Sequence, residues 1–326
     1  MKKIFVLLLF SILLSANLCK VYTKGQENTP FMTRTFTSSS IKEVEATTSG
    51  GSLTLTGDAG SKATVEVYVS RDNWSTEKIK QVLEENYTID VKVEKGKLYV
   101  IAKQKKNTIN WNQQGLSISF KIIVPKQVNS NLKTSGGSIQ ISNLSGSQNF
   151  KTSGGSLLIQ NTSGNIVGLT SGGSITAKSC SGKIELKTSG GSLNMTKLSG
   201  NINASTSGGS VTATDINGTI KTSTSGGSMR LNGISGSVDA ITSGGSLEVK
   251  INSVKDYVKL SNSGNISLTL PGSKGYNLNV KANNIETSGI KDFRGKMEKQ
   301  ILEGTTGNGG AEINVKSTQR VRLSFE

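Results

Sequence analysis

The stretch TSGGSLNMTKLSGNINAS occupies residues 188–205, and the next eighteen residues repeat its pattern as TSGGSVTATDINGTIKTS at 206–223. The pentapeptide Thr-Ser-Gly-Gly-Ser recurs at a fixed interval of 18 residues, beginning at Thr134, Thr152, Thr170, Thr188, Thr206, Thr224 and Thr242. An eighth copy begins earlier, at Thr48. Self-similarity at one fixed period is typical of repeat architectures, in which each unit covers its neighbour.

Apolar residues occupy fixed columns within this repeat. One column directly follows the pentapeptide and comprises Ile139, Leu157, Ile175, Leu193, Val211, Met229 and Leu247. Another follows the Ser-Gly or Asn-Gly turn in the middle of the unit and comprises Ile166, Ile184, Ile202, Ile220 and Val238. The residues beside these columns are mostly polar, as at Asn194 and Thr212. Alternation with a period of two over so few residues predicts short strands with one buried face.

A single strand of this kind cannot bury enough surface to offset its ordering entropy, which is roughly 1–2 kcal/mol per residue for the backbone. Stacking the units in parallel solves the problem, because each coil covers the apolar edge of the previous one. The sequence therefore predicts an all-β fold, a parallel β-solenoid or β-helix with 18-residue coils. A thin core repeated many times also fits the low apolar content of 33%. The handedness and the cross-section stay open.

The paired glycines are predicted to form the structural turns at the corners, where a positive φ or a close backbone approach excludes a Cβ. They are Gly136, Gly137, Gly154, Gly155, Gly172, Gly173, Gly190, Gly191, Gly208, Gly209, Gly226, Gly227, Gly244 and Gly245. Glycine-rich loops can also bind phosphate, but the Gly-x-x-x-x-Gly-Lys-[Ser/Thr] motif is absent. We therefore interpret the glycines as corners.

The sequence divides into a leader and three further segments. They are a signal peptide at about 1–19, an N-terminal start and cap of the solenoid at 38–133, the regular array at 134–251, and irregular C-terminal coils with a cap at 252–326. Within 38–133, Ser75 is expected to cap a helix that runs to about Asn86. Two alternating strands at Ala311–Val315 and Arg320–Phe325 are expected to form the last, closing coils.

The leader decides the predicted compartment. Two lysines precede an apolar run over residues 4–14, and smaller residues follow, which is the order of a secretory signal peptide. A membrane span needs about 20 apolar residues, so the run is too short. A lipid anchor at Cys19 is disfavoured, because Leu18 stands where the bacterial lipobox has a small residue. We expect an exported protein, in the periplasm, at the cell surface or outside the cell, with no transmembrane segment in the mature chain.

The formal charge is +16, and its excess is spread evenly along the chain. A nucleic-acid-binding protein gathers its basic residues on one patch, so no nucleic-acid partner is predicted. The partner stays open between a surface glycan and an envelope protein. Weak attraction to anionic glycans or lipid head groups is one use of such a surface.

Residues that carry chemistry are scarce. The absence of histidine excludes Ser-His-Asp triads and histidine-ligated metal sites. Cys180 falls in an inward column, which favours a buried thiol. Glu185 and Asp239 share an outward column but lie three coils apart, farther than the about 5–9.5 Å between glycosidase carboxyl groups. We predict no catalytic, cofactor-binding or metal site, and no cofactor. The alternative is a carbohydrate-active enzyme or glycan-binding protein with its site in the flanks, where Trp74 and Trp111 could stack on sugars.

The Ser-Gly-x-[Ile/Val] turns, the run Ile122–Lys126 before the array and Leu268–Pro271 after it resemble the bacterial putative-adhesin family, a domain of unknown function. The resemblance covers about residues 38–326. The family's coils typically read Ser-Gly-Asp-Ile, whereas this chain often has Ser or Asn in place of Asp. The resemblance implies a β-solenoid at the cell envelope and carries over no functional residue.

Taken with that resemblance, the sequence favours a non-enzymatic surface protein, adhesive or structural, whose long polar face contacts a glycan or a protein. A scaffold that polymerises end to end is a weaker alternative. So is an ice-binding surface made from the file of threonines that runs from Thr134 to Thr242.

Overall fold

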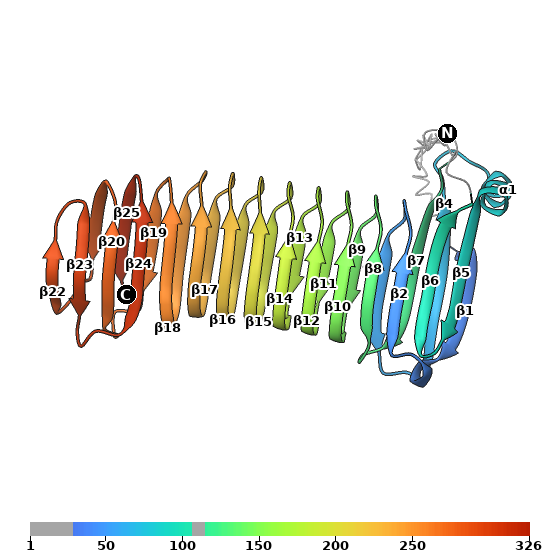
Figure 1. The fold of residues 1–326 in the computed structure, drawn as a ribbon, viewed down its shortest axis with the longest axis horizontal. Helices are drawn as coiled ribbons and strands as arrows, with labels where there is room; N and C mark the ends of the chain where they lie inside the picture. Colours follow the sequence, from blue (N-terminus) through green and yellow to red (C-terminus); the bar gives the residue numbers. More distant parts are fainter. Residues whose placement is uncertain (1–28, 106–114) are drawn as a thin grey trace, which may run out of the picture.

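The computed structural model describes residues 29–105 and 115–326. The predicted signal peptide at 1–19, the possible anchor Cys19 and the tryptophan Trp111 lie outside these residues. Within them, 25 strands form one elongated, hydrogen-bonded sheet system, joined by one α-helix and the short 3-10 helix η1 (Ser38–Ser40) (Figure 1). The predicted all-β class is confirmed. In the same residues, no helix has both the length and the apolar character needed to cross a bilayer.

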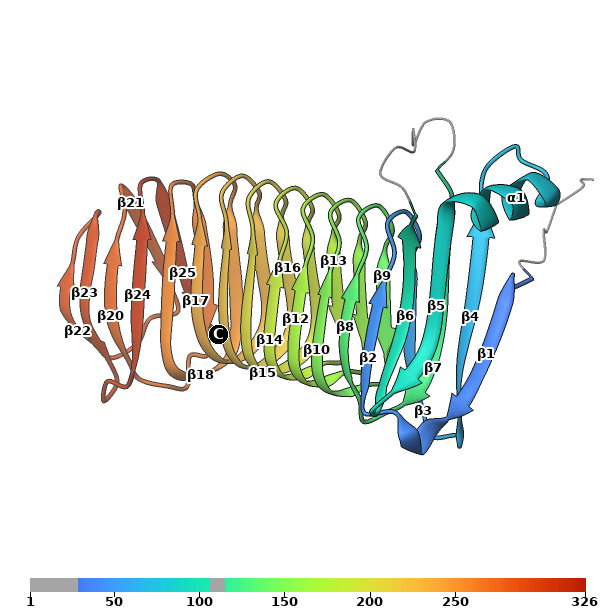
Figure 2. The ribbon, with the colours of Figure 1, turned by 45° about the vertical axis from the view of Figure 1, so that its right-hand side comes forward.

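The strands form two faces, which meet at rounded corners (Figure 2). In spatial order, the first face comprises β1 (Met32–Thr37), β4 (Lys62–Ser70), β7 (Ser117–Pro125), β3 (Leu53–Asp58), β9 (Ile139–Ser142), β11 (Leu157–Gln160), β13 (Ile175–Lys178), β15 (Leu193–Thr206), β16 (Val211–Thr224), β17 (Met229–Thr242), β18 (Leu247–Asn262), β19 (Ile266–Leu270), β25 (Arg320–Phe325) and β21 (Asn284–Ser288).

The second face is the one seen in Figure 1. It comprises β5 (Tyr87–Glu94), β6 (Lys97–Gln104), β2 (Glu43–Thr47), β8 (Asn129–Lys133), β10 (Ser145–Lys151), β12 (Ser163–Leu169), β14 (Ser181–Lys187), the C-terminal halves of β15 to β18, β24 (Ala311–Ser317), β20 (Tyr276–Lys281), β23 (Ile301–Thr306) and β22 (Phe293–Met297). Strands β15 to β18 are long enough to pass round a corner, so each belongs to both faces.

Parallel pairing in the array joins residues 18 positions apart. Ile202 pairs with Ile184 on one side and with Ile220 on the other. The side chain of Ile202 is 3% exposed, whereas the next residue, Asn203, faces solvent. The predicted inward and outward columns are therefore confirmed at these positions. The regular register ends where β17 meets β18, at irregularities between Asn232 and Val238.

Helix α1 (Thr76–Asn86) lies where the sequence predicts it. The hydroxyl of Ser75 accepts a hydrogen bond from the backbone N–H of Lys78 at 3.3 Å, which is the expected N-cap. Val82 and Leu83 are its buried residues. The chain leaves the helix directly into β5, so α1 lies at the N-terminal end of the sheet (Figure 2).

Strands β2 and β3 near the start of the described chain, and β24 and β25 at its end, lie inside the stack, where a layer is one strand of each face joined by a corner. The unit that begins at Thr48 packs directly against the first array unit, because Leu53 of β3 pairs with Ile139 of β9 although 86 residues separate them. Strands β2 and β3 thus lie between β6 and β7 on one side and β8 and β9 on the other.

The tail strands follow the same plan, and here the sequence prediction is wrong. We expected Ala311–Val315 and Arg320–Phe325 to form the last coils. Instead β24 lies between β18 and β20, and β25 lies between β19 and β21. Interior positions suit these strands, because Val321 and Leu323 are fully buried by neighbours on both sides.

Two of the four outermost strands, β5 and β22, carry features that discourage pairing with another molecule. Strands β1, β5 and β22 are antiparallel to their single neighbours, and β21 is parallel to β25 alone. On β5, Lys92 forms ion pairs with Asp90 (3.3 Å) and Glu94 (2.9 Å). On β22, Gly295 has a φ of 148° and lies between Arg294 and Lys296. Short, charged and distorted edge strands are common means of preventing edge-to-edge association, which argues against end-to-end polymerisation.

Candidate binding surfaces

The two glycines of each pair have different roles. A Cβ added to Gly191 would lie 2.1 Å from the carbonyl oxygen of Gly173 in the neighbouring unit. The same contact, at 2.0–2.2 Å, recurs at the other second glycines Gly137, Gly155, Gly173, Gly209 and Gly227. At Gly190 the nearest atom is the oxygen of Gly172, at an ordinary 3.5 Å. Close backbone approach therefore requires glycine at the second position, and neither position of these pairs has a positive φ.

We expect this difference to separate two alanine variants of adjacent residues. Gly191→Ala should lower the free energy of unfolding by about 1–3 kcal/mol, because the backbone of the neighbouring unit must move to admit the methyl group. Gly190→Ala should be nearly neutral, or slightly stabilising because it restricts the unfolded chain. Urea unfolding followed by circular dichroism measures both, and equal losses would contradict the assigned contacts.

The mid-unit turns are the places where the backbone does need positive φ. Their glycines have φ between 109° and 151°, namely Gly146, Gly164, Gly182, Gly200, Gly218 and Gly236. A second left-handed column precedes them and escaped the sequence analysis. It comprises Asn143, Asn161, Ser179, Lys197 and Asp215, with φ between 48° and 58°, and Gly233 with φ 72°. The signal was the presence of Asn, Asp and Gly, which tolerate this conformation best.

The threonine file is an internal hydrogen-bond ladder. Thr188 Oγ1 donates to the carbonyl oxygen of Gly173 at 2.8 Å and accepts from the N–H of Gly191 at 3.2 Å. The seven threonines of this file, which begin the copies of Thr-Ser-Gly-Gly-Ser from Thr134 to Thr242, are all buried, with 0–6% exposure. The ice-binding alternative is therefore wrong, because this file does not face water. Asn262 and Ser317 take the place of threonine in later layers, donating to Gly245 O (2.9 Å) and Gly264 O (2.7 Å).

The first face presents hydroxyl and amide groups in register. From β9 to β16 its outward residues are Gln140, Ser142, Leu158, Gln160, Thr176, Lys178, Asn194, Thr196, Thr212 and Thr214. Lys178 is the one charged residue in this set. From β9 to β16 the face is thus a nearly neutral, hydrogen-bonding surface with a spacing of ~4.8 Å between strands. Strands β17 and β18 add the charged residues Arg230, Glu248 and Lys250.

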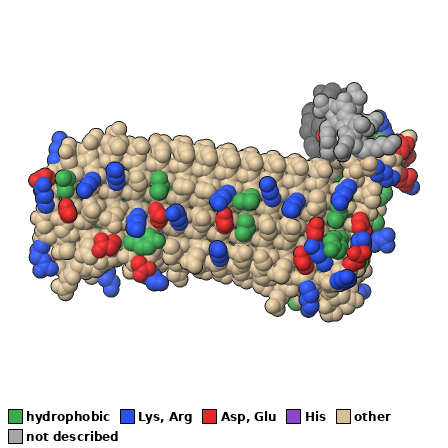
Figure 3. Space-filling model, viewed as in Figure 1, with side chains coloured by type: hydrophobic (Ala, Val, Ile, Leu, Met, Phe, Trp, Pro, Cys, Tyr) green, Lys and Arg blue, Asp and Glu red, His purple; other side chains and the backbone are tan. Residues whose placement is uncertain are grey.

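The second face is charged, and two parallel rows of outward residues run along its regular strands; further charges, such as Lys183 and Glu312, lie outside these rows. The row beside the Thr-Ser-Gly-Gly corner, here named the lysine row, comprises Lys133, Lys151, Leu169, Lys187, Ser205, Ser223, Ile241, Ser261, Lys316 and Lys281. The inner row, two residues back along each strand, comprises Asn131, Asn149, Val167, Glu185, Asn203, Lys221, Asp239, Lys259, Asn314 and Asn279. Figure 3 shows basic side chains along this face, with acidic and further basic ones mixed below them.

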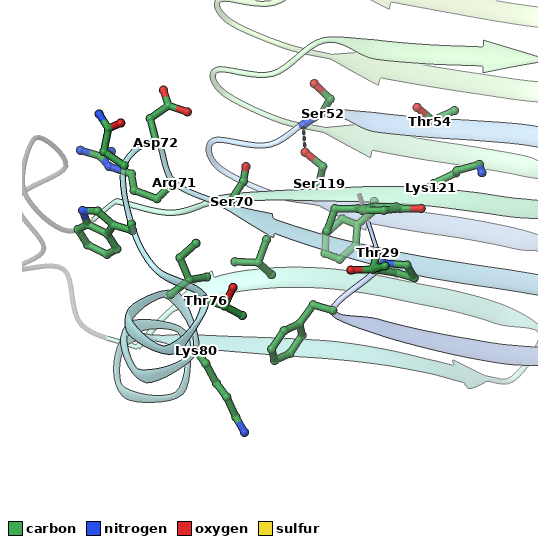
Figure 4. Close-up of a pocket in the computed structure, with 18 residues that line it drawn as sticks. Thr29, Ser52, Thr54, Ser70, Arg71, Asp72, Thr76, Lys80, Ser119 and Lys121 are labelled. Atoms are coloured by element: carbon green, nitrogen blue, oxygen red, sulfur yellow. Dashed lines mark hydrogen bonds between the residues drawn. The ribbon is translucent and has the colours of Figure 1, made fainter. Parts of the chain in front are cut away.

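A groove of about 1390 Å³ lies at the N-terminal end of the first face (Figure 4). Ser119 and Lys121 of β7 line it on the sheet side, and Lys80 lines it from α1. The ring of Trp74 is approached by two cations, Arg71 at 5.7 Å and Lys78 at 4.4 Å from the ring centroid. The indole of Trp74 is also partly buried against the core. The ring that the sequence analysis considered for stacking on sugars is therefore already in contact with protein groups.

Reactive groups are not brought together in the described residues. Cys180 is buried as predicted, and burial raises the pKa of its thiol. Glu185 and Asp239 lie on strands three steps apart in the inner row, about 14 Å at strand spacing. No group of three or more Cys, Asp or Glu side chains in residues 29–105 and 115–326 is placed to hold a metal ion.

No family model matches the chain, and no curated protein matches it. Solved structures similar to it include that of a putative cell adhesion protein from Clostridium sporogenes, 12% identical, with a TM-score of 0.21; the match covers 91% of this chain and 100% of that one. A putative adhesin from Bacteroides fragilis is 13% identical, with a TM-score of 0.33, over 90% of this chain and 96% of that one. Identities and scores at this level carry no argument about what this chain binds.

Proposed function

We propose that this protein is an exported, non-enzymatic protein of the cell surface or envelope, adhesive or structural in role. In this proposal the chain is a parallel β-solenoid of 18-residue coils whose polar faces contact a glycan or a protein partner. The single observation that carries it is the pair of long outward surfaces, one of hydroxyl and amide groups and one with charged residues. Such surfaces offer many hydrogen bonds and charges in register.

Three features support the solenoid. Residues pair in parallel at a constant offset of 18, and both corners repeat with that offset, through the glycine contacts on one side and the left-handed turns on the other. The buried threonine ladder supports it as well, because each hydroxyl satisfies a carbonyl of the adjacent unit. We propose the division into a start and cap at 38–133, an array at 134–251 and C-terminal coils at 252–326 on the same grounds.

The groove beside α1 favours one second candidate, a glycan-binding or carbohydrate-active site in the N-terminal flank. Basic, hydroxyl and aromatic groups line this groove. Among the described residues its one acid is Asp72, which is exposed. A single acid leaves the groove without the carboxyl pair that most glycosidases use.

Binding to a glycan array and to bacterial cells tests the proposal, with the variant Asp72→Asn/Lys80→Gln as a probe of the groove. Both side chains are exposed, so the fold should be unaffected. We expect the protein to bind, the variant to bind equally well, and no array glycan to be shortened. Loss of binding in the variant, or cleavage of a glycan, would favour the second candidate. Failure to bind any glycan or cell would contradict the proposal.

A further inference from the structure

The lysine row is a strip of positive charge that no acid interrupts. It runs from Lys133 to Lys281 over nine strand-to-strand steps of ~4.8 Å, roughly 43 Å in all. Its lysines gather at the two ends, with Lys133, Lys151 and Lys187 at one and Lys316 and Lys281 at the other, and all five are exposed. We infer that the lysine row binds a linear anionic glycan, a polymer that carries carboxylates along an extended chain. This inference rests on the proposed function and names the partner.

Four of the five lysines of the row form no ion pair in the described part of the chain. Lys281 and Lys316 are directly paired neighbours on β20 and β24, and Lys133 and Lys151 are paired on β8 and β10. Like charges opposite one another destabilise a sheet. In the described part of the chain, Lys187 is the one lysine of the row that forms an ion pair, with Glu185 of its own strand. A bound polyanion would relieve the repulsion within both pairs.

The width of the strip favours a single polymer over a membrane surface. The acids Glu185 and Asp239 belong to the inner row, two residues along the strand from the lysine row, or roughly 6.6–6.8 Å. A lipid surface or a duplex would cover both rows, although the inner row carries no net charge, because Lys221 and Lys259 balance its two acids. One extended chain can follow the lysine row alone.

Between its charged ends, the row offers the contacts that sugar rings use. Ser205, Ser223 and Ser261 provide hydroxyl groups, and Ile241 provides an apolar surface that is 44% exposed. Ile241 lines a hollow of about 410 Å³ together with Lys259, Lys281 and Lys316. The one acid in its lining, Asp239, forms an ion pair with Lys221 (3.5 Å). Sugar rings present apolar faces between their hydroxyl groups, which suit the serines and Ile241 at the centre of the lysine row. The lysines at the two ends of the row suit the carboxylates of a polyuronate.

Titration with polygalacturonate, in low salt, tests the inference with two matched double variants. Lys281→Gln/Lys316→Gln removes two charges from the lysine row, and Lys178→Gln/Lys250→Gln removes two from the first face. We expect the row variant to weaken binding at least roughly tenfold, because the polymer then engages only one end. The control should change affinity less than about twofold, since its charges lie on the other face. Digalacturonate, which cannot span both ends, should bind far more weakly than the polymer.

Equal losses in both variants would overturn the inference, because net charge alone would then explain the binding. So would tight binding to phosphatidylglycerol vesicles without binding to polygalacturonate. A protein that binds glycans or cells but not polygalacturonate contradicts the inference and leaves the proposed function standing. A protein that binds none of these contradicts both.

Discussion

Replacing Ile202 by Asp is expected to lower the free energy of unfolding by several kcal/mol, whereas the same residue introduced next door, by Asn203→Asp, should change it by no more than about 0.5 kcal/mol. Ile202 is 3% exposed and stacks between Ile184 and Ile220. A carboxyl group there has no partner, so it must be buried as an unpaired charge or become protonated. Either outcome is costly in a core that is one strand pair thick.

Asn203 is the matched control, because it lies in the same strand and faces solvent. Asn203 pairs with the negatively charged Glu185 on one neighbouring strand and with the positively charged Lys221 on the other. The repulsion and the attraction that a new carboxylate would experience there therefore nearly cancel. Exposed ion pairs contribute little in any case. The midpoints of urea unfolding for the two variants measure the contrast. If Asn203→Asp proved the more damaging change, the inward and outward columns would be reversed, since a shift of one residue exchanges the faces of a strand.

Removal of one complete unit, residues 206–223, should leave a folded protein, whereas removal of the half unit 206–214 should abolish cooperative unfolding. The stability of a repeat stack is approximately a sum of unit and interface contributions, so one unit fewer shortens the stack and preserves its contacts. In the shortened protein Ile202 would meet Val238, and Ala204 would meet Ala240. The deletion also removes Thr222, whose buried Oγ1 has no hydrogen-bond partner.

The half-unit deletion loses half a turn of backbone, so Asp215 follows Ser205 directly. A mid-unit turn then lies over a Thr-Ser-Gly-Gly corner, and the strand that holds Val211 and Ala213 is missing from the first face. Thermal unfolding monitored by circular dichroism distinguishes the two deletions. Similar melting curves for both would show that the 18-residue unit is not the structural repeat.

The array could be predicted from the sequence because each column repeats the same physical requirement. Ile184, Ile202 and Ile220 occupy the same buried position in three consecutive units. A polar residue at one of them would not have changed the interpretation of that position. The helix was predictable for a different reason, since Ser75 and the apolar residues that follow form a local signal. The contact at Gly191 was only half predictable, because the sequence does not show which glycine of a pair meets the neighbouring backbone.

The remaining features depend on contacts between distant segments. Nothing local places β24 between β18 and β20, because the alternating pattern at Ala311–Val315 suits an outer layer equally well. The lysine row was visible only in part. Lys133, Lys151 and Lys187 each precede a copy of Thr-Ser-Gly-Gly-Ser and so share a column in the sequence. At the other end, Lys316 becomes a neighbour of Ser261, and Lys281 a neighbour of Lys316, only through that insertion.

The buried position of the C-terminal strand has a mechanical consequence. β25 is held by parallel hydrogen-bond ladders to β19 and to β21, so a force along the strand from the C-terminus loads both ladders in shear, and many bonds must break together. β1, the first described strand, is bonded to β4 alone, so the same force along β1 loads a single ladder. The fold should therefore resist a pull along β25 better than a pull along β1.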